Sequence, residues 1–144
     1  MTLHLPRLFA VLFAWLTLWQ PGWAEAELVV IVSPLNEIER LTPEQIERLM
    51  LAKDWAFPNG VPALPLDLPR GAAREHFYQR LAGKSANQMA AYWSRQVFTG
   101  GGRPPREGRS EQHMLELVSQ HTGYIGYLSR ESLDNRVRVL LIIP

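Results

Sequence analysis

The chain has 144 residues, with 15 lysines and arginines against 14 aspartates and glutamates, and it contains no cysteine. These charges are nearly balanced, whereas a protein that binds duplex nucleic acid needs a clear basic excess or a basic stripe. A chain of this length builds one domain with a proper core rather than two. Without cysteine, that domain must hold itself together by packing alone.

The first 24 residues have the pattern of a secretory signal peptide. Arg7 precedes an apolar run at residues 8–19, and small residues follow it. We expect cleavage after Ala24 or Ala26, which leaves a single domain at residues 25–144 that does not insert into a membrane. The alternative is a retained membrane anchor, but a spanning helix needs about 20 apolar residues and this run is shorter. Export without cysteine indicates a bacterial periplasm as the location.

A buried strand, a capped helix and a second strand are predicted in the first half of the exported chain. Residues 28–32 form a continuous apolar run, which is typical of a central strand covered on both faces. Thr42 and Gln45 form a capping box that starts a helix of about ten residues, ending near Ala52. Residues 62–66 predict a short apolar strand that leads into the turn at Arg70.

Three helices are predicted next, and they begin after Gly71, Ser85 and Ser110. Glycines at positions 83 and 123 are placed to end the first and the last of these helices. The side chains expected to face the core are Ala73, Phe77 and Leu81 in the first helix, Met89, Tyr92, Trp93 and Val97 in the second, and Met114, Leu117 and Val118 in the third.

A loop and two strands complete the expected elements. Residues 100–105 are rich in glycine and proline and predict a surface loop. Strands are predicted at residues 124–128 and 137–143, with alternate residues of the last strand on one face, namely Val137, Val139, Leu141 and Ile143. Strands separated by helices predict an α/β fold, a three-layer sandwich with a mixed, partly parallel sheet.

The candidate ligand site follows the second predicted strand and opens a helix. Ligands of α/β sheets lie beyond the carboxyl ends of strands, where loops meet helix N-termini. Free N–H groups, the positive helix end and two guanidinium groups meet there, which is how proteins hold small oxyanions. The alternative is that both arginines lie on a solvated helix end, stacked on aromatic stems or paired with Glu75. The residues of this site are Arg70, Gly71, Ala72, Ala73 and Arg74.

Residue sets for catalysis or for metal binding are not recognisable in the sequence. His76, His113 and His121 do not have the spacing of a helical metal site, and there is no cysteine beside them. Residues 83–85 read Gly-Lys-Ser but do not form a Walker loop, because Tyr78 stands where the first glycine is required. We therefore expect no enzyme activity, no metal and no cofactor.

Several stretches, taken in chain order, resemble a known family. Residues 28–36 form a strand that runs into an Asn-containing turn, and residues 41–53 form a capped helix in which Ala52 replaces a glycine. Residues 57–60 form an aromatic turn, and residues 123–127 read Gly-Tyr-Ile-Gly-Tyr. Together they resemble the second lobe of the periplasmic phosphate-binding proteins of ABC transporters, which are type II periplasmic binding proteins. The resemblance covers nearly all of the exported chain and implies the fold of one lobe.

The phosphate loop of that family normally reads Ser-Gly-Thr-Arg before a helix that carries a phenylalanine. The matching positions here are Gly71 to Arg74, followed by Phe77. The arginine and the backbone donors are kept, whereas both hydroxyl groups are missing, and each hydrogen bond to a charged ligand is worth about 1.5–3 kcal/mol. The resemblance implies a domain that binds phosphate or another small oxyanion weakly and non-covalently.

Full-length members of the family clamp their ligand between two lobes, and this chain supplies one. A second copy in a homodimer, or a partner protein, would have to close over the anion. The protein partner that the resemblance implies is an inner-membrane permease or a sensor. The alternative function is a periplasmic interaction or sensor-accessory module with an eroded ligand site, in which the loop at residues 100–109 serves as a contact surface.

Overall fold

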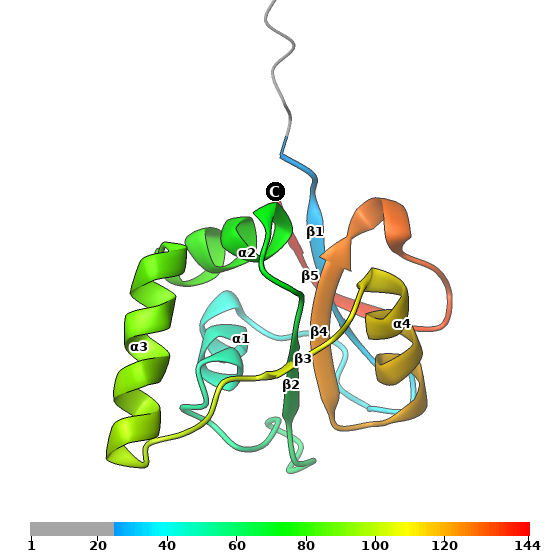
Figure 1. Ribbon diagram of the computed structural model, residues 1–144. Helices are drawn as coiled ribbons and strands as arrows, with labels where there is room; N and C mark the ends of the chain where they lie inside the picture. The colour runs from blue at the N-terminus through cyan, green and yellow to red at the C-terminus, as the bar shows by residue number, and fades with distance from the viewer. Residues whose placement is uncertain (1–24) are drawn as a thin grey trace, which may run out of the picture.

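A computed structural model describes residues 25–144, so the predicted signal peptide at residues 1–24 lies outside the described residues. Figure 1 shows the strands gathered into one sheet with helices packed around it. The elements are, in chain order, β1 (Leu28–Val32), α1 (Pro43–Met50), β2 (Leu64–Asp67), α2 (Ala72–Ala82), α3 (Ala86–Thr99), β3 (Arg106–Glu107), α4 (Glu111–Gln120), β4 (Tyr124–Ser129), a 3-10 turn (Arg130–Ser132) and β5 (Arg138–Ile143).

The sheet is mixed, as predicted. Its strand order is β3-β2-β4-β1-β5, with β2 parallel to both β3 and β4 and β1 antiparallel to both β4 and β5. The carboxyl ends of β2 and β4 therefore lie at the same edge of the sheet, and the carboxyl end of β1 lies at the opposite edge. All five residues of β1 are buried, which confirms it as a strand covered on both faces.

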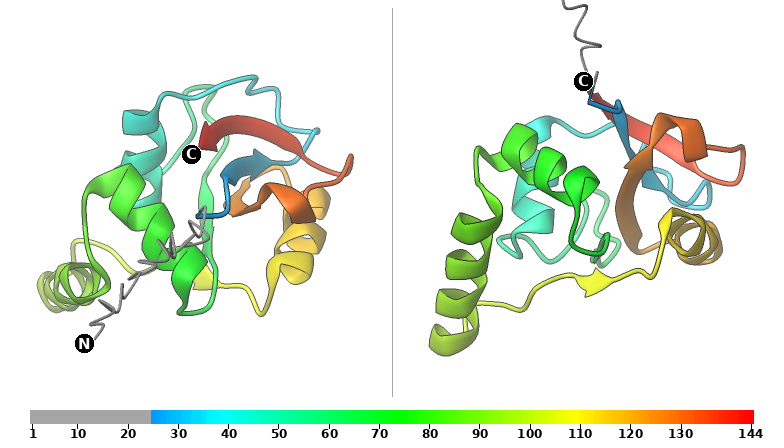
Figure 2. Two further views of the ribbon diagram at one scale, coloured as in Figure 1. Left: turned by 90° about the horizontal axis from the view of Figure 1, so that it is seen from above. Right: turned by 45° about the horizontal axis from the view of Figure 1, so that its top comes forward.

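Helices cover both faces of the sheet, which confirms the three-layer α/β sandwich. In Figure 2, α1 and α2 lie on one side of the sheet and α4 lies on the other. Among the described residues, no helix is long and apolar enough to cross a membrane.

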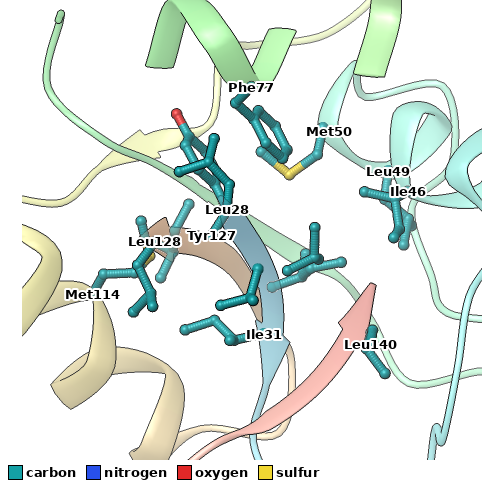
Figure 3. Packing of buried hydrophobic residues seen from close by; sticks show 14 of the residues in the cluster. Leu28, Ile31, Ile46, Leu49, Met50, Phe77, Met114, Tyr127, Leu128 and Leu140 are labelled. Carbon is teal, nitrogen blue, oxygen red and sulfur yellow. The ribbon is translucent and has the colours of Figure 1, made fainter. Parts of the chain in front are cut away.

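Two neighbouring residues of β4 determine how closely α2 and α4 approach the two faces of the sheet. Tyr127 points to one face, where its ring stacks on Phe77 of α2 with centroids 3.7 Å apart and planes 1° apart. Gly126 points to the other face, where any Cβ would overlap the sulfur of Met114 on α4. Figure 3 shows Phe77 and Met114 on opposite sides of the strands. Because side chains alternate along a strand, Tyr127 contacts the helices on one face of the sheet and Gly126 contacts the helix on the other face.

The helix start and stop signals of the sequence are mostly confirmed. Thr42 and Ser85 form complete capping boxes, and the Ser110 hydroxyl accepts from the His113 N–H. Gly83 ends α2 in the left-handed conformation, with φ 62°. Gly123 does not end α4, because the helix ends at Gln120 with His121 as its C-cap residue. A Cβ at Gly123 would lie 2.7 Å from the Pro62 oxygen, so close chain packing requires this glycine.

Two predicted inward faces differ from the structure. Val97 is 57% exposed, since α3 packs against the domain mainly through α2 and its second half extends beyond that contact. In β5 the register shifts opposite Val30 and Ile31, so Leu140 is bulged and buried and the regular alternation is lost. A bulge places two residues opposite one and reverses which side chains face inward beyond it.

The segment predicted as a free loop after α3 is only partly free. Arg106 and Glu107 pair with β2 as the edge strand β3, and the Gly108 N–H donates to the Asp67 carbonyl at 2.8 Å. This pairing brings Glu107 to the end of β2, where the candidate site begins.

Ala52 has a backbone conformation that favours glycine, with φ 55°. The left-handed conformation costs a residue with a Cβ about 1–2 kcal/mol of strain. Glycine avoids this strain, but it loses more conformational entropy on folding, which offsets part of the gain. We expect Ala52→Gly to raise the melting temperature by about 2–4 °C in thermal unfolding monitored by circular dichroism. The control is Ala91→Gly in the exposed face of α3, which should lower it; a fall in both variants would contradict the assignment of strain.

Candidate functional site

The candidate site begins where β2 ends at the sheet edge and α2 starts. Gly71 is the N-cap residue of α2 and provides no side-chain cap. The first intrahelical bond runs from the Glu75 N–H to the Gly71 carbonyl at 3.0 Å. The N–H groups of Ala72, Ala73 and Arg74 therefore have no acceptor within the helix, and they form the positive end of its dipole.

The two arginines of the site are not equivalent. The Arg74 guanidinium turns back towards the sheet, where its Nε lies 3.3 Å from Asp67 Oδ2. Its Nη1 lies 3.2 Å from Glu107 Oε2 and 3.3 Å from the Leu68 carbonyl oxygen. Arg70 is exposed, and within residues 25–144 it makes no side-chain hydrogen bond or ion pair. Arg74 is thus held by carboxylates, and Arg70 is the free cation of the pair.

Asp67 organises this arrangement, although the sequence analysis did not single it out. The residue is 1% exposed, and its carboxylate accepts hydrogen bonds from the Tyr78 hydroxyl at 2.9 Å, from the Tyr127 hydroxyl and from the Leu68 N–H at 3.0 Å. Together with Arg74, these donors surround the carboxylate. A charged residue at the end of an apolar strand, in Leu66-Asp67-Leu68, was the available signal, because a buried carboxylate requires partners.

Burial raises the pKa of the Asp67 carboxyl, and this effect outweighs the hydrogen bond from Tyr127, the charge of Arg74 and the hydrogen bond from Tyr78, which lower it. Burial also raises the pKa of Tyr78 and Tyr127, and the charge of Asp67 raises both further. The two phenols therefore stay protonated at ordinary pH and act as hydrogen-bond donors to the carboxylate.

The charges at the site leave little attraction for an anion. Arg74 is neutralised by Asp67 and also contacts Glu107, so these three groups together carry one negative charge. An oxyanion at the start of α2 would interact with Arg70 and the free N–H groups, while the Asp67 carboxylate repels it. The helix end contributes only about half an elementary charge.

A groove of about 800 Å³ runs from the start of α2 along α3. Arg70, Gly71 and Arg74 line one end of it, and α3 forms its long apolar wall. Trp93 lines this wall at 6% exposure, and its Nε1 has no hydrogen-bond partner in the described part of the chain. The α3 residues along the groove are Ala86, Asn87, Met89, Ala90, Trp93, Ser94, Val97 and Phe98.

Each of the three histidines in residues 25–144 contacts another group of the chain. His76 Nδ1 lies 2.8 Å from Glu25 Oε2, His113 Nδ1 accepts from the Arg109 N–H, and His121 Nδ1 accepts from the Gly123 N–H. Residues 25–144 contain no cluster of three side chains suited to a metal ion.

Replacing Asp67 tests whether the buried carboxylate stabilises the sheet edge. We expect Asp67→Asn to lower the free energy of unfolding by about 1–3 kcal/mol near neutral pH, because an NH2 group replaces one acceptor oxygen and leaves a buried donor among Tyr78, Tyr127 and Arg74 without an acceptor. Chemical denaturation monitored by tryptophan fluorescence measures this loss. The control is Asp134→Asn, whose ion pair with Arg136 is short at 2.7 Å but exposed, so its effect should be small.

The effect of Asp67 should also depend on pH. Its pKa is higher in the folded protein than in the unfolded chain, so the pH-dependent part of its contribution to stability is fully present below the unfolded pKa of about 3.9. That part alone is lost as the pH rises through the raised folded pKa. The stability difference between the wild type and Asp67→Asn should thus be larger at acid pH than at neutral pH. A difference that shrinks on acidification would contradict the raised pKa.

The fold is similar to that of several solved phosphate receptors. The chain matches an ABC-type phosphate transport receptor from Vibrio cholerae with a TM-score of 0.63 and 18% identity, over 80% of this chain and 46% of that one. It matches a putative phosphate ABC transporter substrate-binding protein from Clostridium perfringens, solved with bound phosphate, with a TM-score of 0.64 and 17% identity, over 80% and 45%. It matches PstS from Borrelia burgdorferi with a TM-score of 0.59 and 14% identity, over 80% of this chain and 47% of that one.

No protein-family model and no curated protein sequence matches the chain. The match to solved structures shows the fold, because the sequence identities are low. The chain spans less than half the length of these receptors. It therefore has the fold of the phosphate ABC transporter substrate-binding proteins in a partial form that corresponds to a single lobe.

Proposed function

We propose that this chain is an exported protein-interaction module, built on a single lobe of the phosphate-receptor fold, and that it has no catalytic role. The observation that carries this proposal is the ion pair between Arg74 and the buried Asp67. The guanidinium that would hold phosphate is occupied by a carboxylate of the same chain. The periplasmic location rests on the predicted signal peptide, and the partner is a protein of the cell envelope, such as a membrane sensor or a permease.

Two further observations support an interaction role over solute capture. Both hydroxyl ligands that the resemblance implies are absent at Gly71 and Ala73. The chain also spans under half of the receptors it matches, so a bound anion would stay open to water on one side unless another protein covered it. Exposed apolar side chains remain on the surface and are available for contacts.

A second candidate function is weak binding of phosphate or another small oxyanion. The uncapped start of α2 favours it, because the N–H groups there have no helical acceptor and Arg70 is free. In this proposal Arg70, Gly71, Ala72 and Ala73 contact the anion. Arg74 would contribute only after leaving Asp67, and a second copy of the chain could cover the open side.

Phosphate titration distinguishes the two functions. A site with a Kd of about 0.1 mM would gain about 2.7 kcal/mol of stability in about 10 mM phosphate. For the interaction module, we expect the melting temperature in phosphate to equal that in sodium chloride of the same ionic strength. Differential scanning calorimetry of the protein produced from the full chain measures both.

An extra stabilisation by phosphate would favour the second candidate. The decisive controls are Arg70→Ala and Arg80→Ala, two exposed arginines of which only Arg70 lies at the start of α2. An effect that is lost in Arg70→Ala and kept in Arg80→Ala would establish the anion site and contradict the interaction proposal as stated.

A further inference from the structure

The outer half of α3 carries the most exposed large apolar side chain in the described residues. Phe98 is 91% exposed and Val97 is 57% exposed, at the point where α3 leaves the rest of the domain (Figure 1). Trp55 at 72% and Leu64 at 43% line a second groove, which shares Val97 and Pro104 with the groove along α3. We call these four side chains, Trp55, Leu64, Val97 and Phe98, the α3 ridge. Such apolar patches mark interaction sites, and aromatic residues dominate binding energy.

The wall of the groove beside this ridge suits a helix. Ala86, Ala90 and Ser94 follow one another at four-residue spacing and line the groove, so small side chains form a row along α3. Small residues in such a row let another helix approach closely, and its own side chains can enter between them. From Ala86 to Phe98 the wall is about 18 Å long, which matches about twelve residues of a helix.

The charges around the two grooves indicate which charge the partner carries. Arg70, Arg103 and Arg106 line them, and within residues 25–144 none of the three pairs with a carboxylate. Of the lining carboxylates, Asp54 is paired with Arg48 at 2.8 Å, which leaves Glu75. α3 itself contains no acidic residue. Arg70, Arg103 and Arg106 thus face Glu75 and the one net negative charge of the Arg74, Asp67 and Glu107 group, so the rim keeps one net positive charge and an acidic partner complements it.

From these observations we infer that the α3 ridge and the groove beside it bind an acidic amphipathic helix of a partner protein. The partner's apolar side chains contact Phe98 and Val97, and its carboxylates lie near Arg70 and Arg103. The inference rests on the proposed interaction function and names the surface that performs it. This is the helix-in-groove mode of recognition, in which one apolar face provides the affinity and the rim provides specificity.

Synthetic peptides test the chemistry directly. The probe is a fluorescein-labelled peptide of about 16 residues with leucines on one helical face and glutamates elsewhere, and its control carries lysines in place of the glutamates. We expect the protein from the full chain to bind the glutamate peptide in fluorescence anisotropy, at least about tenfold more tightly than the lysine peptide, and less tightly as salt is added. Absence of binding, or equal binding of both peptides, would overturn the inference.

Matched variants locate the binding surface. Phe98→Ala should weaken binding about tenfold or more, whereas Leu35→Ala should not, because Leu35 is 70% exposed and lines neither of the two grooves. Arg103→Glu should weaken binding of the glutamate peptide, and Arg80→Glu, with the same change in net charge, should not. Equal effects within either pair would overturn the assignment. All four residues are exposed, so unchanged thermal unfolding confirms that each variant is folded.

Photo-crosslinking in the source organism separates the surface from the proposed function. The crosslinking residue p-benzoylphenylalanine is placed in turn at the six exposed large apolar positions, Leu35, Trp55, Leu64, Val97, Phe98 and Ile142. Adducts at ridge positions with a protein that contains an acidic amphipathic helix support the inference. Adducts only at Leu35 or Ile142 would overturn the surface and leave the interaction function standing. An adduct of twice the chain mass would identify a second copy as the occupant, and no adduct at any position would contradict both proposals.

Discussion

The buried carboxylate of Asp67 is the group on which the edge of this sheet depends. It lies at the end of β2 and is bonded by Tyr127 of β4 and by Tyr78 and Arg74 of α2. Moving a carboxylate out of water costs several kcal/mol, which only a full set of donors offsets. Each donor is therefore held in place by the cost of leaving the carboxylate unpaired. Through Arg74, the constraint extends to Glu107 and thus to the edge strand β3.

The same constraint explains why the start of α2 is a poor anion site in spite of its free N–H groups. A phosphate ion would have to displace Asp67 from Arg74 while losing translational freedom, whereas Asp67 is attached to the chain and loses none. The internal carboxylate is also already surrounded by two phenols that remain protonated. Arg74 therefore stabilises the fold, and of the two arginines at the start of α2, Arg70 is the one that is unpaired within residues 25–144.

The features that the sequence predicted correctly rest on residues close together in the chain. The capping boxes at Thr42 and Ser85 join residues three positions apart, and the glycine stop at position 83 is equally local. The Asp67 cluster was missed because Tyr127 lies 60 positions away and no spacing rule connects the two. The inward face of α3 was wrong at Val97 because periodicity gives the direction of a face and not how far its neighbours extend.

The way in which α3 is anchored presents its exposed apolar end for binding to a partner. The helix is anchored by Trp93, which is buried, and by Tyr92, whose hydroxyl donates to the Leu51 carbonyl at 2.7 Å. Beyond this anchor, little burial stabilises the last turns, so the capping box at Ser85 and the left-handed Gly100 must keep the helix formed. A helix anchored at its middle and defined at both ends holds Phe98 in a fixed position in water. Its apolar surface is thus preorganised, which lowers the entropy that a partner loses on binding.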